Sequence, residues 1–236
     1  MRTVLPLLSL LIVGPALAAH PLTVDDAGTL DPSTLELEVS SAVADSEFGS
    51  THGVGIAARI GLLGSLDSGV AVAWFETPTE ESATEFGVDL KFAPGRAAGW
   101  RPRPVLRSDF ALVSLSTEAE LSFAGVCGGL TWKPSAGVVS VEACWSEPLS
   151  SSFSSSAAWS VAGGFFLPVH RKATLAAEYR LGQWADWSTD VARIGLLTRL
   201  GRGNLSLGAE LPVQGARLGV LDSAIVLVGW TAEFGL

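Results

Sequence analysis

The stretch that decides the fold is residues 224–236, which read Ala-Ile-Val-Leu-Val-Gly-Trp-Thr-Ala-Glu-Phe-Gly-Leu. Every second residue from the first onward is apolar, whereas the alternate residues pass from Ile225 to the polar Thr231 and Glu233. A period of two predicts a β-strand with one face against an apolar medium and the other against water or a packed interior. The alternation continues to the last residue, where the terminal strand of a soluble domain tends to fray. We therefore expect this strand to close a membrane barrel, because lipid does not tolerate an open sheet edge.

Eleven further segments repeat the alternation. In residues 34–43, for example, Leu35 and Leu37 alternate with Glu36 and Glu38. We expect a single up-and-down antiparallel transmembrane β-barrel of twelve strands, an even number as in single-chain bacterial barrels. The expected strands are residues 34–43, 52–63, 69–77, 84–93, 104–115, 118–132, 138–147, 157–167, 174–182, 191–200, 205–213 and 224–236.

The sixth segment, residues 118–132, carries an irregularity. Its apolar phase runs through Leu121 and Phe123 but resumes at Val126, one position out of step. This shift predicts a β-bulge near Gly125.

The first residues predict export. Residues 1–18 have the form of a cleaved secretory signal peptide, with Arg2 before an apolar run at 4–13 and Ala-Leu-Ala at 16–18. The run is too short to span a membrane. The domain that remains, residues 19–236, is then the barrel, and we expect it in the bacterial outer membrane.

Composition narrows the class further. Hydrophobic residues make up 48% of the chain and the mean hydropathy is +0.39, yet no run of about 18 apolar residues follows the signal. Apolar residues interleaved with polar ones are typical of outer-membrane barrels. The 24 acidic against 15 basic residues argue against nucleic acid as a partner. We expect outer-membrane lipid around the barrel, a small-molecule solute as partner, and no cofactor, since the common phosphate, protease and zinc motifs are absent.

The polar phase of the strands gives the candidate lining of a lumen. Small residues on the same phase, Gly55, Gly61, Gly87, Gly129, Gly195 and Gly208, are expected to leave space there. Two readings stay open: an open pore, or an internal network of ion pairs that fills the barrel, since barrels between eight and sixteen strands lie between filled and open ones. The pore-lining candidates are Glu36, Glu38, Arg59, Asp89, Lys91, Glu142, Glu178, Arg180, Arg193, Arg199, Glu210 and Glu233.

The connections between strands differ in charge. With both chain ends in the periplasm, the periplasmic connections are basic, whereas the opposite loops are acidic and include a serine run at 150–156. The basic residues are Arg96, Arg101, Arg103, Lys133, Arg171, Lys172 and Arg202.

The two cysteines test the register of one hairpin. If residues 134–137 form the turn, Cys127 and Cys144 lie directly opposite each other on the polar face. An exported chain makes a disulfide plausible, and two free, packed thiols are the alternative. Either state is structural, since no neighbouring motif suggests redox chemistry.

Residues 20–30, His-Pro-Leu-Thr-Val-Asp-Asp-Ala-Gly-Thr-Leu, lead into the Leu-Glu-Leu-Glu-Val strand at 35–39. This opening resembles that of the meta-pathway phenol degradation family of outer-membrane proteins, over residues 21–39. The resemblance implies a barrel transporter for small aromatic compounds, and it carries over no functional residues. Asp25 and Asp26 alone supply too few oxygens for calcium, so we expect no metal site.

The sequence is compatible with three functions. The first is a passive channel for small solutes, aromatic or hydrophobic ones included. The second is a structural or surface-binding barrel with a plugged lumen, in which the acidic, serine-rich loops engage a partner. The third is an outer-membrane lipid hydrolase using His52, the one histidine near the outer rim, but no serine or asparagine partner stands at a fixed spacing from it. We expect no catalytic residues and no enzyme activity.

Overall fold

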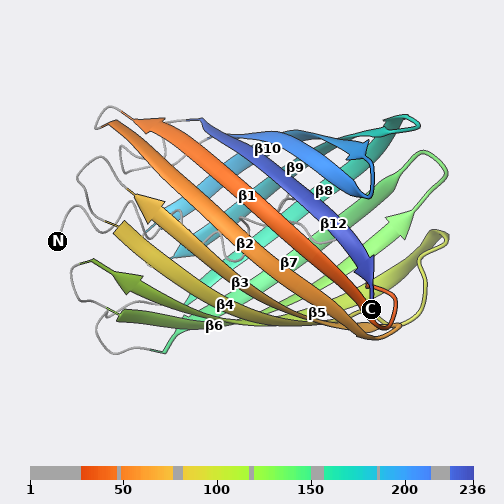
Figure 1. Cartoon of the computed structure of the whole chain (residues 1–236), viewed down its shortest axis with the longest axis horizontal. Coiled ribbons are helices and arrows are strands. Elements are labelled where there is room, and N and C mark those ends of the chain that lie inside the picture. The colour runs from red at the N-terminus through yellow and green to blue at the C-terminus, as the bar shows by residue number, and fades with distance from the viewer. Residues whose placement is uncertain are drawn as a thin grey trace.

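The computed structural model describes residues 28–46, 49–76, 82–116, 120–149, 157–184, 187–213 and 224–236. Twelve strands form one closed antiparallel barrel in which each strand pairs with its neighbours in sequence and β12 pairs with β1 (Figure 1). The number of strands and their order confirm the prediction. The strands are β1 (Thr34–Ser46), β2 (Gly49–Leu63), β3 (Leu66–Glu76), β4 (Ser82–Phe92), β5 (Gly99–Leu115), β6 (Glu120–Lys133), β7 (Val138–Pro148), β8 (Ala158–His170), β9 (Ala173–Trp184), β10 (Trp187–Leu200), β11 (Gly203–Pro212) and β12 (Ile225–Gly235).

Several strands are longer than predicted. β1 continues to Ser46 and β5 begins at Gly99, beyond the ends that side-chain alternation marks. The ladder consists of main-chain hydrogen bonds, so it continues through residues whose side chains no longer alternate. Among the described residues, no helix is long and apolar enough to cross a membrane. The predicted signal, residues 1–18, lies outside the described part of the chain, and its cleavage stays a prediction.

The register at the closing seam sets the two faces of the wall. Leu35 pairs with Phe234 and Val39 with Trp230, which places apolar side chains side by side. Their neighbours Glu36 and Glu233 pair with each other on the opposite face. Because a barrel has an inside and an outside, this alternation repeats around the ring.

The exposure of the side chains shows which face is outside. Ile56 is 64% exposed, whereas the carboxylate residue Glu142 is only 4% exposed. The exposed apolar residues follow the outward phase of every strand; they include Val39, Val54, Ile56, Val70, Val72, Phe86, Val88, Leu106, Val126, Val141, Val161, Tyr179, Ile194, Leu207, Val226 and Val228. The barrel therefore presents an apolar outer surface and places charged residues such as Glu142 and Arg193 on its inner face.

The predicted bulge near Gly125 is wrong. Pairing runs without a shift through this region, with Gly125 opposite Asp109 on β5 and Ser146 on β7. The error came from reading Phe123 as outward-facing; it shares the inward phase of Gly125 and Cys127. The register shifts instead lie between Gly61 and Leu63, Gly99 and Arg103, and Pro168 and His170.

Tight turns gather at one end of the barrel, which we call the short-turn end. Residues 64–65, 171–172 and 201–202 each join two strands there, and Gly201 adopts a φ of 62° that favours glycine. The carboxyl end of the chain lies at this end as well (Figure 1). Connections at the opposite end, including the serine run at 150–156, lie partly or wholly outside the described residues.

Candidate functional site in the barrel lumen

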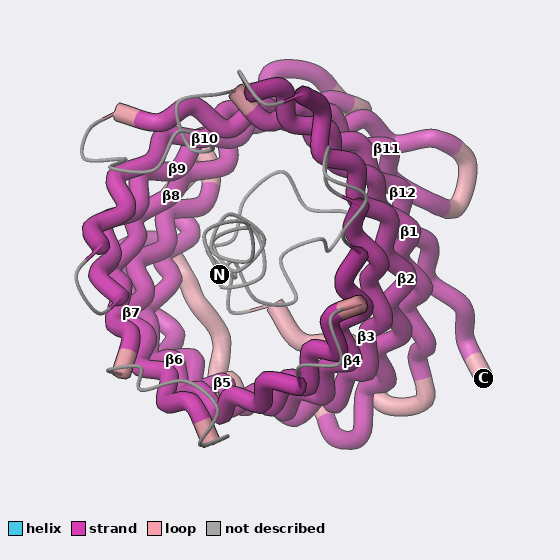
Figure 2. Tube along the Cα trace, turned by 90° about the vertical axis from the view of Figure 1, so that its left-hand side faces the viewer, coloured by secondary structure: helices cyan, strands magenta, loops and turns pink. Residues whose placement is uncertain are grey.

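The twelve strands form one closed ring, which Figure 2 shows end-on. Every pore-lining candidate from the sequence lies on the inward phase of its strand, from Glu36 and Glu38 on β1 to Glu233 on β12. Whether this lumen conducts is a separate question. The sequence reasoning missed five inward-facing charged residues: Asp67, Glu85, Arg103, Arg107 and Asp109.

The missed residues carried a usable signal. Arg107 and Asp109 alternate with the apolar Leu106 and Phe110, so a face assignment of the fifth segment would have found them. Arg103 was expected in a periplasmic connection, but it is part of β5 and pairs with Thr131 on β6.

One ion pair bridges two strands across a glycine. Arg59 on β2 and Asp89 on β4 are both register partners of Gly69 on β3. The Arg59 Nη2 atom lies 3.1 Å from Asp89 Oδ1 and 3.2 Å from Oδ2. A side chain at position 69 would occupy the place of the Asp89 carboxylate, so glycine is what allows the pair to lie against the wall.

A second cluster centres on Glu142 of β7. The Glu142 Oε1 atom lies 3.8 Å from Arg107 Nη2 on β5 and 3.6 Å from Arg180 Nη2 on β9. Arg180 also contacts Glu178 Oε1 through Nε at 3.3 Å and donates from Nη1 to the Ser160 hydroxyl at 3.1 Å. A buried carboxylate needs polar partners, and the two arginines are such partners for Glu142.

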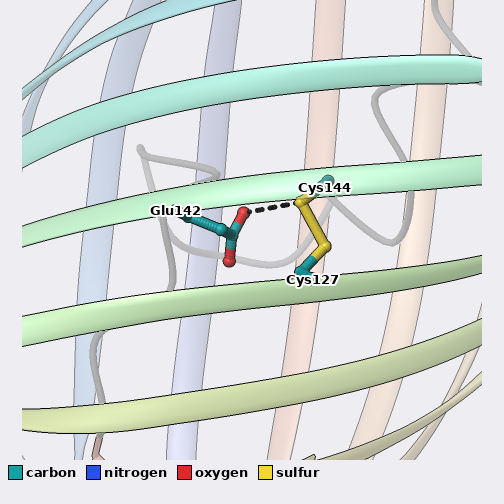
Figure 3. Close-up of side chains that lie close together, drawn as sticks. All are labelled: Cys127, Glu142 and Cys144. Carbon is teal, nitrogen blue, oxygen red and sulfur yellow. Dashed lines mark hydrogen bonds between the residues drawn. A yellow bond between two sulfur atoms is a disulfide. The ribbon is translucent and has the colours of Figure 1, made fainter.

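The two cysteines lie beside this cluster. Cys127 and Cys144 are directly opposite across the β6–β7 hairpin, which confirms the predicted register, and the structure joins them in a disulfide (Figure 3). The Cys144 Sγ atom is 3.2 Å from Glu142 Oε1, and Arg107 Nη2 donates to Cys127 Sγ at 3.3 Å. A disulfide sulfur has no hydrogen, so the first of these is a close polar contact without a donor.

The disulfide also bears on whether this cluster could bind a metal ion. Ligand atoms of Cys127, Glu142 and Cys144 lie within 4.8 Å of one another, a spacing that a metal ion could use. Zinc and copper take thiolate sulfur, and these two sulfurs are bonded to each other instead. We therefore assign the two cysteines a structural role, as a cross-link between β6 and β7.

A third ion pair is buried between β10 and β11. Arg193 on β10 and Glu210 on β11 are register partners, and the guanidinium contacts the carboxylate through both Nε and Nη2. On the β6–β7 wall the hydroxyls of Thr131 and Ser140 are hydrogen-bonded at 2.9 Å. These four buried polar side chains are thus paired with their neighbours, as burial requires.

Carboxylates face each other at two places on the inner wall, at the β1–β12 seam and between β4 and β5. Glu36 lies directly opposite Glu233, and Asp89 directly opposite Asp109. Like charges opposite each other repel, and Arg59 is the register partner that relieves Glu36. Over the described inward faces carboxylates outnumber bases: Glu36, Glu38, Asp67, Glu85, Asp89, Asp109, Glu142, Glu178, Glu210 and Glu233 stand against Arg59, Lys91, Arg103, Arg107, Arg180, Arg193 and Arg199.

Toward the opposite end the inner wall becomes apolar. Ala42 and Ala44 of β1 form a buried cluster with Ile225 of β12. Phe75 and Val113 are also buried on the inward phase. The sequence had marked the apolar start of this phase in β12, but the extent of the apolar band on β3 and β5 was not predicted.

The predicted role of the small residues needs correction at two positions. A Cβ at Gly61 would collide with the main chain of Asp31, and one at Gly129 would lie 2.6 Å from the Val141 carbonyl oxygen. These glycines allow close backbone approach rather than free space. At Gly87 a Cβ would lie 3.8 Å from the Phe110 carbonyl oxygen, an ordinary contact distance, so a small side chain would fit there without a collision.

The position of His52 does not support the hydrolase hypothesis. His52 lies on the exposed outer face of β2, where its register partners are Val43 and Glu76 rather than a serine. A serine hydrolase needs its nucleophile within hydrogen-bond reach of the histidine.

Comparison with known proteins gives the class of the fold. No family model matches the sequence, and no curated protein matches it. The NanC porin has a TM-score of 0.63 at 10% identity, over 84% of this chain and 100% of that one. The KdgM porin in complex with disordered oligogalacturonate has a TM-score of 0.61 at 9% identity, over 84% and 99%. The TodX monoaromatic hydrocarbon channel, in a deltaS2S3 mutant, has a TM-score of 0.51 at 9% identity, over 89% and 92%.

At these identities the likeness shows the fold alone. The chain has the closed antiparallel barrel of outer-membrane porins, and the three similar structures are porins and channels rather than enzymes. The resemblance of residues 21–39 to the phenol degradation family stays a prediction.

Proposed function

We propose that the protein is a passive channel of the bacterial outer membrane for small solutes. The observation that carries the proposal is the inversion of the usual burial pattern. Apolar side chains such as Ile56 and Val72 are exposed around the barrel, while charged ones such as Glu142 and Arg193 are enclosed. In a closed ring of strands this is the distribution that suits lipid outside and water inside. The short-turn end then faces the periplasm.

The directions of the ion pairs favour an open lumen over a plugged one. Arg193 and Glu210 join adjacent strands, and Arg59 and Asp89 join strands two apart. The contacts of Glu142 with Arg107 and with Arg180 likewise join strands two apart, and Arg180 and Glu178 lie on one strand. These pairs lie along the wall, which supports a lumen that they do not bridge.

The lining also suggests the class of solute. The excess of carboxylates argues against polyanions, in contrast to the oligogalacturonate named for the KdgM porin. The apolar band with Phe75, Val113 and Ile225 suits neutral solutes with apolar surface, small aromatic compounds included. Neutral and cationic solutes are therefore the proposed cargo.

Planar-bilayer recording tests the proposal. Purified, heat-modifiable barrel is expected to give discrete conductance steps and a reversal potential that favours cations in a salt gradient. Liposome swelling is expected to be faster with neutral aromatic solutes than with sugar acids of similar size. Absence of steps at any voltage would rule out the channel and revive the plugged, surface-binding barrel.

A further inference from the structure

The segment before β1 lies against the inner wall at the short-turn end. The Ser33 amide donates to the Gly61 carbonyl at 3.0 Å, and the Thr34 amide donates to the Asp31 carbonyl at 3.0 Å. These bonds turn the chain back across the start of the barrel. Residues 29–31, which we call the lead-in, then contact inward-facing residues of β3 and β5.

Asp67 makes the central contact. Its residue is 1% exposed, and it lies on the inward phase of β3. The Leu30 amide donates to both carboxylate oxygens, at 3.1 Å to Oδ1 and 3.2 Å to Oδ2. Burying a carboxylate is costly unless it accepts hydrogen bonds, so this contact stabilises both the aspartate and the docked lead-in.

Arg103 holds the lead-in from the neighbouring wall. Its Nη2 atom donates to the Thr29 hydroxyl oxygen at 3.0 Å and also to the Ala93 carbonyl. The Thr29 hydroxyl in turn donates to the Gly64 carbonyl at 3.1 Å. The lead-in is thus hydrogen-bonded both to the β2–β3 turn and to β5.

Gly61 shows that the fit is close. The Asp31 carbonyl lies where a Cβ at position 61 would be. Any residue larger than glycine at this position would therefore displace the lead-in. Residues of β2, β3 and β5 therefore all contact or accommodate this short segment.

From these contacts we infer that the lead-in is a built-in constriction of the periplasmic mouth, positioned by Asp67 and Arg103. The inference rests on the proposed channel function, because a constriction matters only where solute passes. It assigns to residues 29–31 a part in setting conductance, and to Asp67 a positioning role.

Two variants release the lead-in by different routes. Leu30→Pro removes the amide hydrogen that Asp67 accepts, and Leu30→Ala is its control because the amide remains. Asp67→Ala removes the acceptor, and Asp67→Asn is its control because a side-chain oxygen remains. Each protein is first checked for heat-modifiable migration, so that only closed barrels are compared.

Two measurements are made on the full-length processed protein. Hydrogen exchange of a peptide that contains residues 29–33 is expected to be slow in the native protein and in Leu30→Ala. It is expected to be at least tenfold faster in Leu30→Pro and Asp67→Ala. Single-channel conductance is expected to rise in the same two variants and to stay near the native value in Leu30→Ala.

The outcomes separate the two proposals. Conducting channels with the same conductance in all variants would overturn the constriction and leave the channel standing. Unchanged exchange in Leu30→Pro and Asp67→Ala would also overturn it. Failure of every protein to conduct, the released variants included, would overturn the channel itself and the constriction with it.

Discussion

At the scale of single residues, Glu142 is the carboxylate that we expect to affect the ion selectivity of the proposed channel. It is the carboxylate that lies between Arg107 and Arg180, within 4 Å of both guanidinium groups. Without the charge of Glu142, the wall around Arg107 and Arg180 would have one carboxylate fewer and would become more positive. Charged side chains that ring a pore set its ion preference.

We therefore predict that Glu142→Gln shifts selectivity toward anions. The reversal potential in a salt gradient should move in the anion-preferring direction, while Glu147→Gln on the outward phase of the same strand should leave it in place. The measurement is the zero-current potential in a planar bilayer. An equal potential for both variants would mean that the cluster does not face the conducting path.

Gly69 gives a second prediction at this scale. A methyl group there collides with the Asp89 carboxylate and displaces it from Arg59. We expect Gly69→Ala to destabilise the barrel by about 1–3 kcal/mol, the usual cost of overpacking a well-packed position. Gly128→Ala is the control, because nothing lies within 4 Å of its Cβ position.

Urea unfolding in lipid vesicles, followed by Trp fluorescence, measures both glycine variants. If Gly69→Ala and Gly128→Ala unfold at the same urea concentration, Gly69 has no special role in seating the ion pair.

The same residues show what sequence can and cannot reveal. Alternation placed Arg59, Asp89 and Glu142 on the polar face, and the structure puts them on the inward phase. Alternation did not reveal the ion-pair partners, because Arg59 on β2 extends across β3 to reach Asp89 on β4. That partnership depends on register across three strands and on a glycine in the middle one.

At the scale of elements, the β6–β7 hairpin is where sequence reasoning reached furthest. The turn at residues 134–137 fixes the register, and the register places Cys127 opposite Cys144. The bulge predicted for the same hairpin failed because apolar Phe123 was taken to mark the outward face. Since parts of this inner wall are apolar, hydrophobicity alone did not define inside and outside there.

The disulfide in this hairpin should stabilise the barrel. The two cysteines are 17 residues apart, and closing a loop of about that length lowers the entropy of the unfolded chain by an amount worth about 3 kcal/mol. We expect the double variant Cys127→Ser, Cys144→Ser to fold but to unfold at lower urea.

A thiol assay supplies the independent check. The denatured, unreduced native protein should show no reactive thiol, and two should appear after reduction. Reactive thiols before reduction, with an unchanged unfolding midpoint in the double variant, would contradict the disulfide.

At the scale of the whole molecule, the outer apolar belt makes a depth-dependent prediction. Val72 lies mid-strand and outward, whereas Leu62 lies outward at the short-turn end of β2. Arginine at the midplane of a barrel costs about 2–4 kcal/mol and much less near the interface. Val72→Arg should therefore destabilise the barrel in vesicles far more than Leu62→Arg does. Equal effects in the same urea titration would argue that the belt is not in contact with lipid.

The contact between the end of the chain and the start of β1 makes a circular permutant of the barrel feasible. The Leu236 amide donates to the Ser33 carbonyl at 2.8 Å, so the tail of the chain touches the point where β1 begins. A peptide linker from Leu236 to residue 28, with new chain ends placed in another hairpin, would leave the strand pairing unchanged. Residues 29–31 would then be held by the main chain on both sides.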